Sequence, residues 1–175
     1  QFVLMTMKFG IPYLMMKSFD PAAMLAAIGD IELGITNIGG VPAMWSAMSL
    51  APEIENTDLS RIRVAATGAE SVPEPMLKDW QQRGILLQEV YGMTETTGTI
   101  CMLPPEDHDP NGNKRMRSAG KPLPGVDLRI VDGAGNDMPV GEVGEVWTRS
   151  SNNMIGYWNL PDATKGTVAD GGWIK

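Results

Sequence analysis

Short apolar runs alternate with helix-forming segments through the first two thirds of this 175-residue chain. The expected strands cover residues 12–16, 33–38, 61–67 and 84–89, and helices begin near residues 21, 42 and 74. Strands separated by single helices pair in parallel, because each helix carries the chain back across one face of the sheet. We therefore predict an α/β fold in which residues 1–118 form a mostly parallel sheet with crossover helices.

Local sequence signals indicate where these helices begin and end. Asp20 followed by Pro21 is typical of an N-cap and first helical residue, and Gly29 is suited to end that helix in a left-handed conformation. Ser71 and Glu74 have the spacing of a capping box at the start of a later helix. Each predicted strand is thus joined to the next through a helix.

The pattern changes near residue 118. Residues 126–131 and 142–148 alternate apolar and polar side chains with a period of two, and turn-forming residues 132–136 separate them. We predict that residues 119–175 form part of an antiparallel β subdomain. The β-rich last third argues against a flavodoxin-like receiver module, the alternative that the first part alone leaves open.

Composition excludes several classes of function. A formal net charge of −7 repels nucleic acid and anionic membranes at long range. The only cysteine, Cys101, is expected to be a small core residue and excludes an intrachain disulfide; the only histidine, His108, is expected to be solvated in a polar loop at residues 104–113. Without an apolar stretch of about 18 residues, we expect no transmembrane segment and a cytoplasmic location. The oligomeric state is left open.

The run Tyr91-Gly92-Met93-Thr94-Glu95 follows the last predicted parallel strand. It offers an aromatic face for a base, close backbone approach for a phosphate and a carboxylate for a metal ion. Because open α/β sheets bind ligands at the carboxyl ends of their strands, this turn is a candidate nucleotide site. The alternative is a simple turn in which Gly92 permits the bend and Glu95 faces water.

A second turn, Thr67-Gly68-Ala69-Glu70-Ser71, ends the preceding strand. Parallel strands that are neighbours end at the same edge of a sheet, so we expect the two loops to form opposite walls of one crevice. The alternative is that Gly68 only marks a turn and that Ser71 and Glu74 only cap a helix.

Eight motifs, in order, resemble landmarks of the adenylate-forming superfamily, which includes acyl-CoA synthetases, firefly luciferase and peptide-synthetase adenylation domains. The motifs are Phe19-Asp20-Pro21, Gly40-Val41-Pro42, Thr67-Gly68-Ala69-Glu70, Tyr91-Gly92-Met93-Thr94-Glu95, Gly120-Lys121-Pro122, Pro139-Val140-Gly141-Glu142-Val143-Gly144-Glu145, Gly156-Tyr157-Trp158 and Asp170-Gly171-Gly172-Trp173. The resemblance spans residues 19–173 and implies a segment of the large N-terminal domain of such an enzyme, most similar to a fatty-acid–CoA ligase.

The resemblance also implies roles for the residues of both turns. The implied nucleotide-binding residues are Gly68, Ala69, Glu70, Tyr91, Gly92 and Met93. Among these, the Tyr91 ring would stack on adenine, while residues 68–70 would line the other side of the base and the neighbouring acyl pocket. Thr94 and Glu95 are the implied catalytic residues: the Thr94 hydroxyl would donate to the α-phosphate, and Glu95 would hold Mg²⁺.

The implied reaction is activation of a small-molecule carboxylic acid by ATP, followed by transfer of the acyl group to coenzyme A. A fatty acid is the first choice of substrate, because the chain is rich in methionine and apolar residues. The alternatives are an aryl-acid–CoA ligase, a peptide-synthetase adenylation domain, or a nucleotide-binding relative that has lost catalysis.

We also expect the chain to be a piece of a longer protein, because it begins with Gln1 and ends in a strand-like run. The resemblance implies that the family's phosphate loop, ribose-binding aspartate and catalytic lysine lie outside these residues. The segment alone is therefore expected to be inactive in adenylation.

Overall fold

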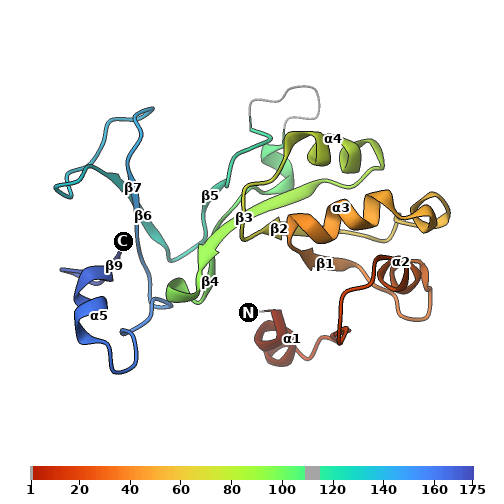
Figure 1. Cartoon of the computed structure of the whole chain (residues 1–175), viewed down its shortest axis with the longest axis horizontal. Helices are drawn as coiled ribbons and strands as arrows, with labels where there is room; N and C mark the ends of the chain where they lie inside the picture. Colours follow the sequence, from red (N-terminus) through yellow and green to blue (C-terminus); the bar gives the residue numbers. More distant parts are fainter. Residues whose placement is uncertain (1, 109–114) are drawn as a thin grey trace. The chain divides into compact units, whose positions relative to one another are not determined.

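The computed structural model describes residues 2–108 and 115–175, and part of the predicted 104–113 loop therefore lies outside the described residues. The elements follow one another in the order α1 (Phe2–Phe9), α2 (Pro21–Gly29), β1 (Asn37–Gly40), α3 (Pro42–Leu50), η1 (Pro52–Asn56), β2 (Val64–Gly68), α4 (Glu74–Gln82), β3 (Leu87–Met93), η2 (Thr94–Thr96), β4 (Gly98–Met102), η3 (Pro105–Asp107), β5 (Lys121–Pro122), β6 (Asp127–Val131), β7 (Glu145–Arg149), α5 (Pro161–Thr167), β8 (Val168–Ala169) and β9 (Trp173–Ile174). The predicted fold class is confirmed: an α/β chain with a mostly parallel first sheet and an antiparallel second sheet (Figure 1).

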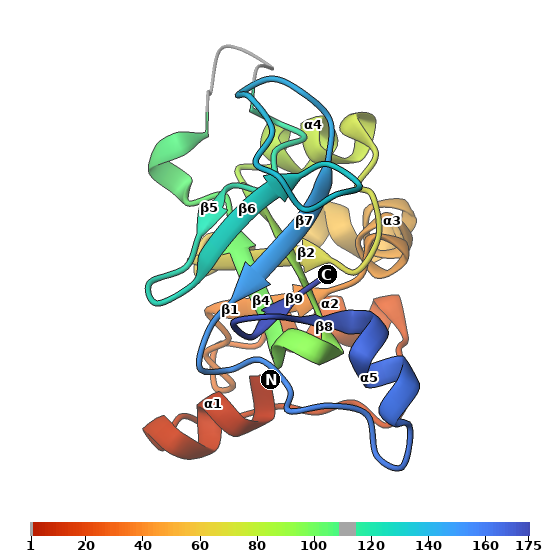
Figure 2. The same ribbon diagram turned by 90° about the vertical axis from the view of Figure 1, so that its left-hand side faces the viewer.

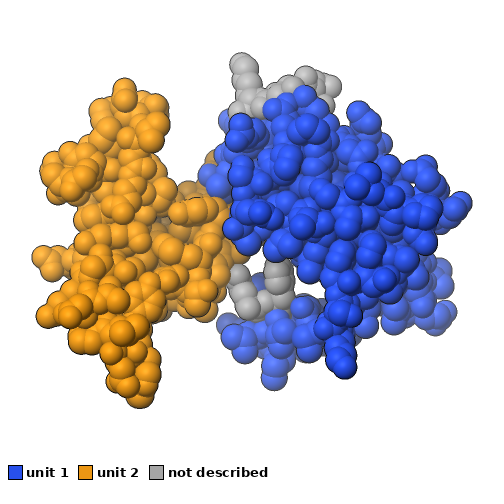
Figure 3. Space-filling view, viewed as in Figure 1, with its two compact units in different colours: residues 1–90, 103–120 blue, residues 91–102, 121–175 orange. Residues whose placement is uncertain are grey.

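Two compact units make up the chain (Figure 3). The first consists of residues 1–90 and 103–120, and the second of residues 91–102 and 121–175. The subdomain boundary predicted near residue 118 stays a prediction. None of the described helices has the length and apolar character needed to cross a membrane.

Parallel pairing of three strands organises the first unit. β1 pairs with β2 up to Gly40↔Thr67, and β2 pairs with β3 up to Gly68↔Val90. Helix α3 connects β1 to β2, and α4 connects β2 to β3, as the strand–helix alternation predicts. The sheet as a whole has the strand order β1-β2-β3-β4-β5, in which β4 and β5 are antiparallel. The register therefore aligns the carboxyl ends of β2 and β3.

Two tryptophans dominate the core between α3 and α4. Trp45 and Trp80 are each 1% exposed, and their rings meet edge to face with 5.0 Å between centroids. The Trp80 indole N–H donates to the Trp45 carbonyl at 3.3 Å, and the Trp45 indole N–H lies 3.2 Å from the carbonyls of Gly40 and Ala66. Because both indole N–H groups have a hydrogen-bond acceptor, Trp45 and Trp80 are buried without an unpaired polar group.

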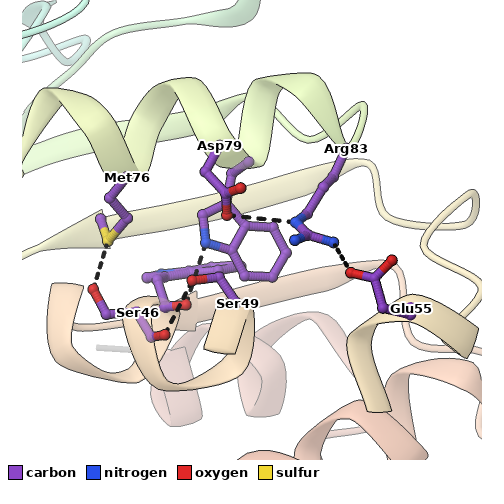
Figure 4. A network of polar contacts seen from close by, with 8 residues as sticks. Ser46, Ser49, Glu55, Met76, Asp79 and Arg83 are labelled. Atoms are coloured by element: carbon purple, nitrogen blue, oxygen red, sulfur yellow. Dashed lines mark hydrogen bonds and ion pairs between the residues drawn. The ribbon is translucent and has the colours of Figure 1, made fainter. Parts of the chain in front are cut away.

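Polar contacts add to this packing at the edges of α4 (Figure 4). Arg83 donates to Asp79 at 3.4 Å and to Glu55 of η1 at 3.1 Å. Near the start of α4, the Ser46 hydroxyl of α3 donates to the Met76 sulfur at 3.4 Å. These ion pairs are partly exposed, so each contributes little to stability compared with the tryptophan pair.

Three local predictions in the first unit were wrong. Residues 12–16 form no strand, because the segment leaves α1 as irregular backbone and pairs with no neighbouring strand among the described residues. Ser71 and Glu74 form no capping box: the N-cap is Pro73, which has no capping side chain, and Glu74 is the first helical residue, bound instead to Lys78 at 2.7 Å. The third wrong prediction is that Gly29 ends α2 in a left-handed conformation.

Gly29 is the last residue of α2, but the cap that follows, Asp30, is extended with φ −70°, so no left-handed residue ends this helix. The start of α2 is as predicted, since the Asp20 carboxylate accepts a 2.7 Å hydrogen bond from the Ala23 N–H. Cys101 is buried in β4, also as predicted. His108 was expected to be solvated but is half-buried near Leu77, and this burial lowers its pKa.

The second unit contains the antiparallel sheet, with strand order β6-β7-β9-β8 (Figure 2). The predicted hairpin turn is present: the Asp132 carboxylate accepts hydrogen bonds from the N–H groups of Ala134 and Asn136 at 2.9 and 2.8 Å. One face of the sheet is buried at Thr148 and Ile174, which are 0% exposed. Helix α5 and the segment before it connect β7 to β8 of this sheet, and both contribute to the candidate site.

Candidate functional site

The first predicted turn leaves the sheet at the end of β2. A Cβ atom at Gly68 would lie 2.4 Å from the Val90 carbonyl oxygen, so only glycine fits beside β3 at this position. Ala69 follows with φ +76°, a left-handed conformation that residues with a side chain rarely adopt. Glu70 is exposed. Backbone strain of this kind often accompanies a functional site, which makes the turn a candidate on structural grounds.

The second predicted turn begins with an exposed aromatic ring. Tyr91 lies near the end of β3 and is 41% exposed. The next residue, Gly92, lies so close to β4 that an added Cβ would be 1.9 Å from the Gly98 carbonyl oxygen. Glycine therefore permits the backbones of β3 and β4 to meet directly at the residue after Tyr91.

Thr94 and Glu95 lie on η2, a tight turn fixed from within by Thr96. The Thr96 side chain is 2% exposed, and its hydroxyl oxygen lies 3.1 Å from the Met93 N–H nitrogen and 2.8 Å from the Gly98 carbonyl oxygen. Thr94 is exposed and Glu95 is partly exposed. Sequence reasoning missed Thr96, whose only sequence signal is its place directly after Thr94 and Glu95.

The Glu95 carboxylate has a partner far along the chain. The Tyr157 hydroxyl donates a 2.6 Å hydrogen bond to Glu95 Oε1. This bond, followed by the backbone N–H of Glu95 itself, lowers the pKa of the carboxyl group below its ordinary value. The same interaction raises the pKa of the Tyr157 hydroxyl, against a smaller lowering by the Thr167 side chain. Glu95 is thus ionised and Tyr157 protonated at neutral pH.

In the sequence, Tyr157 belongs to the motif Gly156-Tyr157-Trp158, and this motif alone implies no particular role for its hydroxyl. The 62 residues that separate it from Glu95 leave no local pattern that could connect the two. Only the folded second unit brings the hydroxyl to the carboxylate.

The arrangement fits one particular kind of metal site. In the described residues, 2–108 and 115–175, no group of three or more His, Cys, Asp or Glu side chains is placed to hold a metal ion. A single ionised carboxylate instead suits Mg²⁺, which is usually bound by one or two carboxylates together with substrate phosphates. Glu95 therefore fits a metal that arrives with a phosphate ligand.

The predicted site residues fall in both compact units. Tyr91, Gly92, Met93, Thr94 and Glu95 lie together at the end of β3 and in η2, in the second unit. Gly68, Ala69 and Glu70 lie in the first. The convergence of the two loops on one crevice stays a prediction.

Comparison with known proteins gives a family match over most of the chain. The AMP-binding enzyme family matches residues 1–158. The fatty acid–[acyl-carrier-protein] ligase ScoC of Streptomyces coeruleorubidus is 38% identical over 146 residues, covering 82% of this chain and 27% of the relative. The indoleacetate–CoA ligase of Aromatoleum aromaticum is 34% identical over 157 residues, covering 90% of this chain and 29% of the relative.

Solved structures also resemble this chain. The N-terminal domain of FACL13 from Mycobacterium tuberculosis superposes with a TM-score of 0.85 at 28% identity, covering 99% of this chain and 42% of that one. The amide bond synthetase McbA from Marinactinospora thermotolerans gives a TM-score of 0.81 at 31% identity, covering 91% of this chain and 31% of that one. The chain thus spans less than half the length of these similar proteins.

Proposed function

Because the chain belongs to the AMP-binding enzyme family of the adenylate-forming superfamily, we propose that the protein containing it activates a carboxylic acid with ATP and forms an acyl-CoA thioester. A carboxylate oxygen attacks the α-phosphorus of ATP, pyrophosphate leaves, and an acyl-adenylate results. The thiol sulfur of coenzyme A then attacks the acyl carbonyl, and AMP leaves. Holding the acid and the nucleotide side by side supplies a proximity term that reaches about 7–11 kcal/mol in the best cases.

The residues of the second turn carry this proposal. The exposed Tyr91 ring stacks on adenine, and the Thr94 hydroxyl donates to the α-phosphate oxygens. Glu95 binds Mg²⁺, which when bound neutralises charge on the phosphates as pyrophosphate departs. One observation carries the proposal: the Glu95 carboxylate, on the turn that follows the exposed Tyr91 ring, is ionised and accepts a hydrogen bond from the Tyr157 hydroxyl.

The residues of the first turn are proposed, separately, to contact the nucleotide. Gly68 and the left-handed Ala69 allow close approach of a ligand to the backbone, and Glu70 offers an exposed polar side chain. Strained backbone conformations are concentrated at sites where a ligand approaches the main chain closely, which supports this role for the first turn.

A fatty acid remains the first choice of substrate, supported by the apolar, methionine-rich composition and by the relative ScoC, a fatty acid–[acyl-carrier-protein] ligase. An aryl acid is the second candidate, favoured by the similar indoleacetate–CoA ligase and by a feruloyl-CoA synthase that is 32% identical over 155 residues. A cytoplasmic location stays a prediction.

The proposal is tested with the full-length protein and a panel of fatty, aryl and amino acids. We expect acid-dependent exchange of labelled pyrophosphate into ATP, and thioester formation when coenzyme A is added, both fastest with fatty acids. Exchange with amino acids and no thioester would indicate a peptide-synthetase adenylation domain instead. Nucleotide binding without exchange on any acid would indicate a relative that has lost catalysis.

A second experiment concerns the 175-residue segment itself. Calorimetry with ATP and Mg²⁺ should show weak binding at most, because the family's phosphate loop and ribose-binding aspartate are expected outside these residues. Tight binding would show that the segment needs neither.

A further inference from the structure

Three hydrogen bonds join Glu95 of η2 and Thr97, the residue directly after η2, to residues 152–157. The Tyr157 hydroxyl donates to Glu95 Oε1 at 2.6 Å, and the Met154 N–H donates to the Glu95 carbonyl at 2.7 Å. The third bond runs from the Thr97 hydroxyl to the Asn152 carbonyl. Glu95 is therefore fixed at both ends, by its main chain and by its carboxylate, from one short segment.

Tyr157 is itself held in place by helix α5. Its N–H donates to the Thr164 hydroxyl oxygen at 2.9 Å, and that hydroxyl donates to the Leu160 carbonyl at 3.0 Å. Gly156 has φ +149°, and a Cβ added there would lie 2.7 Å from the Thr164 methyl group. The glycine thus lets the chain pack directly against α5, so the phenol projects from a fixed backbone.

The bond to Glu95 has the character of an orienting contact. Hydrogen bonds from a neutral hydroxyl to a carboxylate are short, about 2.5–2.7 Å, and stronger than neutral pairs, which fits the observed 2.6 Å. An ionised carboxylate has about four acceptor positions, so a hydroxyl on Oε1 leaves others for a second ligand. Side chains that orient a metal ligand in this way typically change metal affinity by about 10–100-fold when they are removed.

We propose that Tyr157 is a positioning residue, whose hydroxyl holds the Glu95 carboxylate in the orientation that binds the divalent cation of the metal–ATP complex. This inference rests on the proposed function. Tyr157 does not touch the reacting atoms in this scheme; it acts through Glu95. The rest of the 152–164 segment serves to hold the phenol at the correct distance.

The test is direct binding of Mn²⁺, as a paramagnetic substitute for Mg²⁺, to the full-length protein with ATP, measured by electron paramagnetic resonance. Tyr157→Phe keeps the ring and removes only the hydroxyl, so we expect Mn²⁺ to bind about 10-fold more weakly. Tyr13→Phe is the matched control, because Tyr13 is a 47% exposed tyrosine outside the site. It should leave Mn²⁺ binding unchanged.

A double-mutant cycle separates positioning from a general structural role. In a Glu95→Gln background, Tyr157→Phe should weaken Mn²⁺ binding no further, because the group through which it acts is gone. Equal losses in both backgrounds, or an unchanged Mn²⁺ affinity in a folded Tyr157→Phe variant, would overturn the proposal. If Tyr157→Phe does not fold, Thr164→Val decides: it keeps the phenol but removes the acceptor of the Tyr157 N–H, and it should also weaken Mn²⁺ binding.

Failure of this inference is distinguishable from failure of the proposed function. Wild-type protein that performs acid-dependent pyrophosphate exchange, with a Tyr157→Phe variant of unchanged Mn²⁺ affinity, would leave the function standing and reject the positioning role. Wild-type protein without exchange on any acid would reject the function, whatever the Mn²⁺ measurements give.

Discussion

The hydroxyl of Tyr157 lies 2.6 Å from Oε1 of Glu95, although 62 residues separate the two along the chain. The bond lowers the pKa of the Glu95 carboxyl group, and it ties the turn after β3 to the segment before α5. We propose that this carboxylate is held in a fixed orientation because it binds a cation together with a phosphate ligand.

Removal of the Glu95 charge should abolish adenylation while the fold survives. Glu95→Gln keeps the size of the side chain but replaces the anionic oxygen that would bind Mg²⁺. We expect acid-dependent pyrophosphate exchange in the full-length protein to fall by orders of magnitude, with thermal unfolding near that of the wild type. Glu142→Gln, at an exposed position outside the site, is the control. Exchange at the wild-type rate in the Glu95 variant would remove this residue from the mechanism.

Gly92→Ala should destabilise the hairpin between β3 and β4. The new Cβ would lie 1.9 Å from the Gly98 carbonyl oxygen, so the two backbones must separate. Overpacking typically costs about 1–3 kcal/mol of stability, and this clash is with rigid backbone. Gly133→Ala is the matched control, because an added Cβ there meets nothing within 4 Å. Thermal unfolding of both variants checks the prediction, and equal melting temperatures would contradict the close approach.

Trp80→Ala should cost about 3–5 kcal/mol of stability, the usual range for removing a buried aromatic side chain. Trp80 is 1% exposed, packs edge to face against Trp45, and donates a hydrogen bond to its carbonyl. Trp158→Ala, at a residue that is 89% exposed, should change stability by about 0.5 kcal/mol or less. Denaturant unfolding of the two variants measures the difference. Similar losses would mean that the tryptophan pair does not organise the core.

Glu89→Gln should stabilise the protein at neutral pH. Burial raises the pKa of Glu89, a shift that Arg117 only partly opposes, so the folded state holds the proton more tightly than the unfolded state. The contribution of Glu89 to stability is therefore complete below its unfolded pKa, about 4.3, and is lost as pH rises through the folded pKa. The gain in melting temperature of the variant should be present at pH 7 and vanish below about pH 4.

Glu74→Gln provides the control of opposite sign for this pH effect. The hydrogen bond from Lys78 lowers the pKa of the partly exposed Glu74, so the contribution of Glu74 to stability is present above its unfolded pKa and disappears as pH falls. This variant should be slightly less stable than wild type at pH 7 and equal to it in acid. The same trend with pH in both variants would contradict the burial of Glu89.

Much of the fold could be predicted from local signals. The alternation of apolar and helix-forming runs indicated the parallel strands and their crossover helices, and Asp20 marked the start of α2 because its side chain bonds within the same turn. The wrong predictions arose where the local structure depends on contacts with another segment of the chain. Residues 12–16 have strand-like composition, but a strand exists only when another backbone pairs with it.

The candidate site divides in the same way. The amino-acid sequence by itself determined which chemical groups are present: the ring of Tyr91, the hydroxyl of Thr94 and the carboxylate of Glu95 are neighbours along the chain and share one turn. Only the tertiary structure decided that the Tyr157 hydroxyl meets that carboxylate and that Gly68 must accommodate the Val90 carbonyl. The physical reason is that local patterns record interactions within a few residues, whereas contacts between distant segments depend on how the whole chain packs.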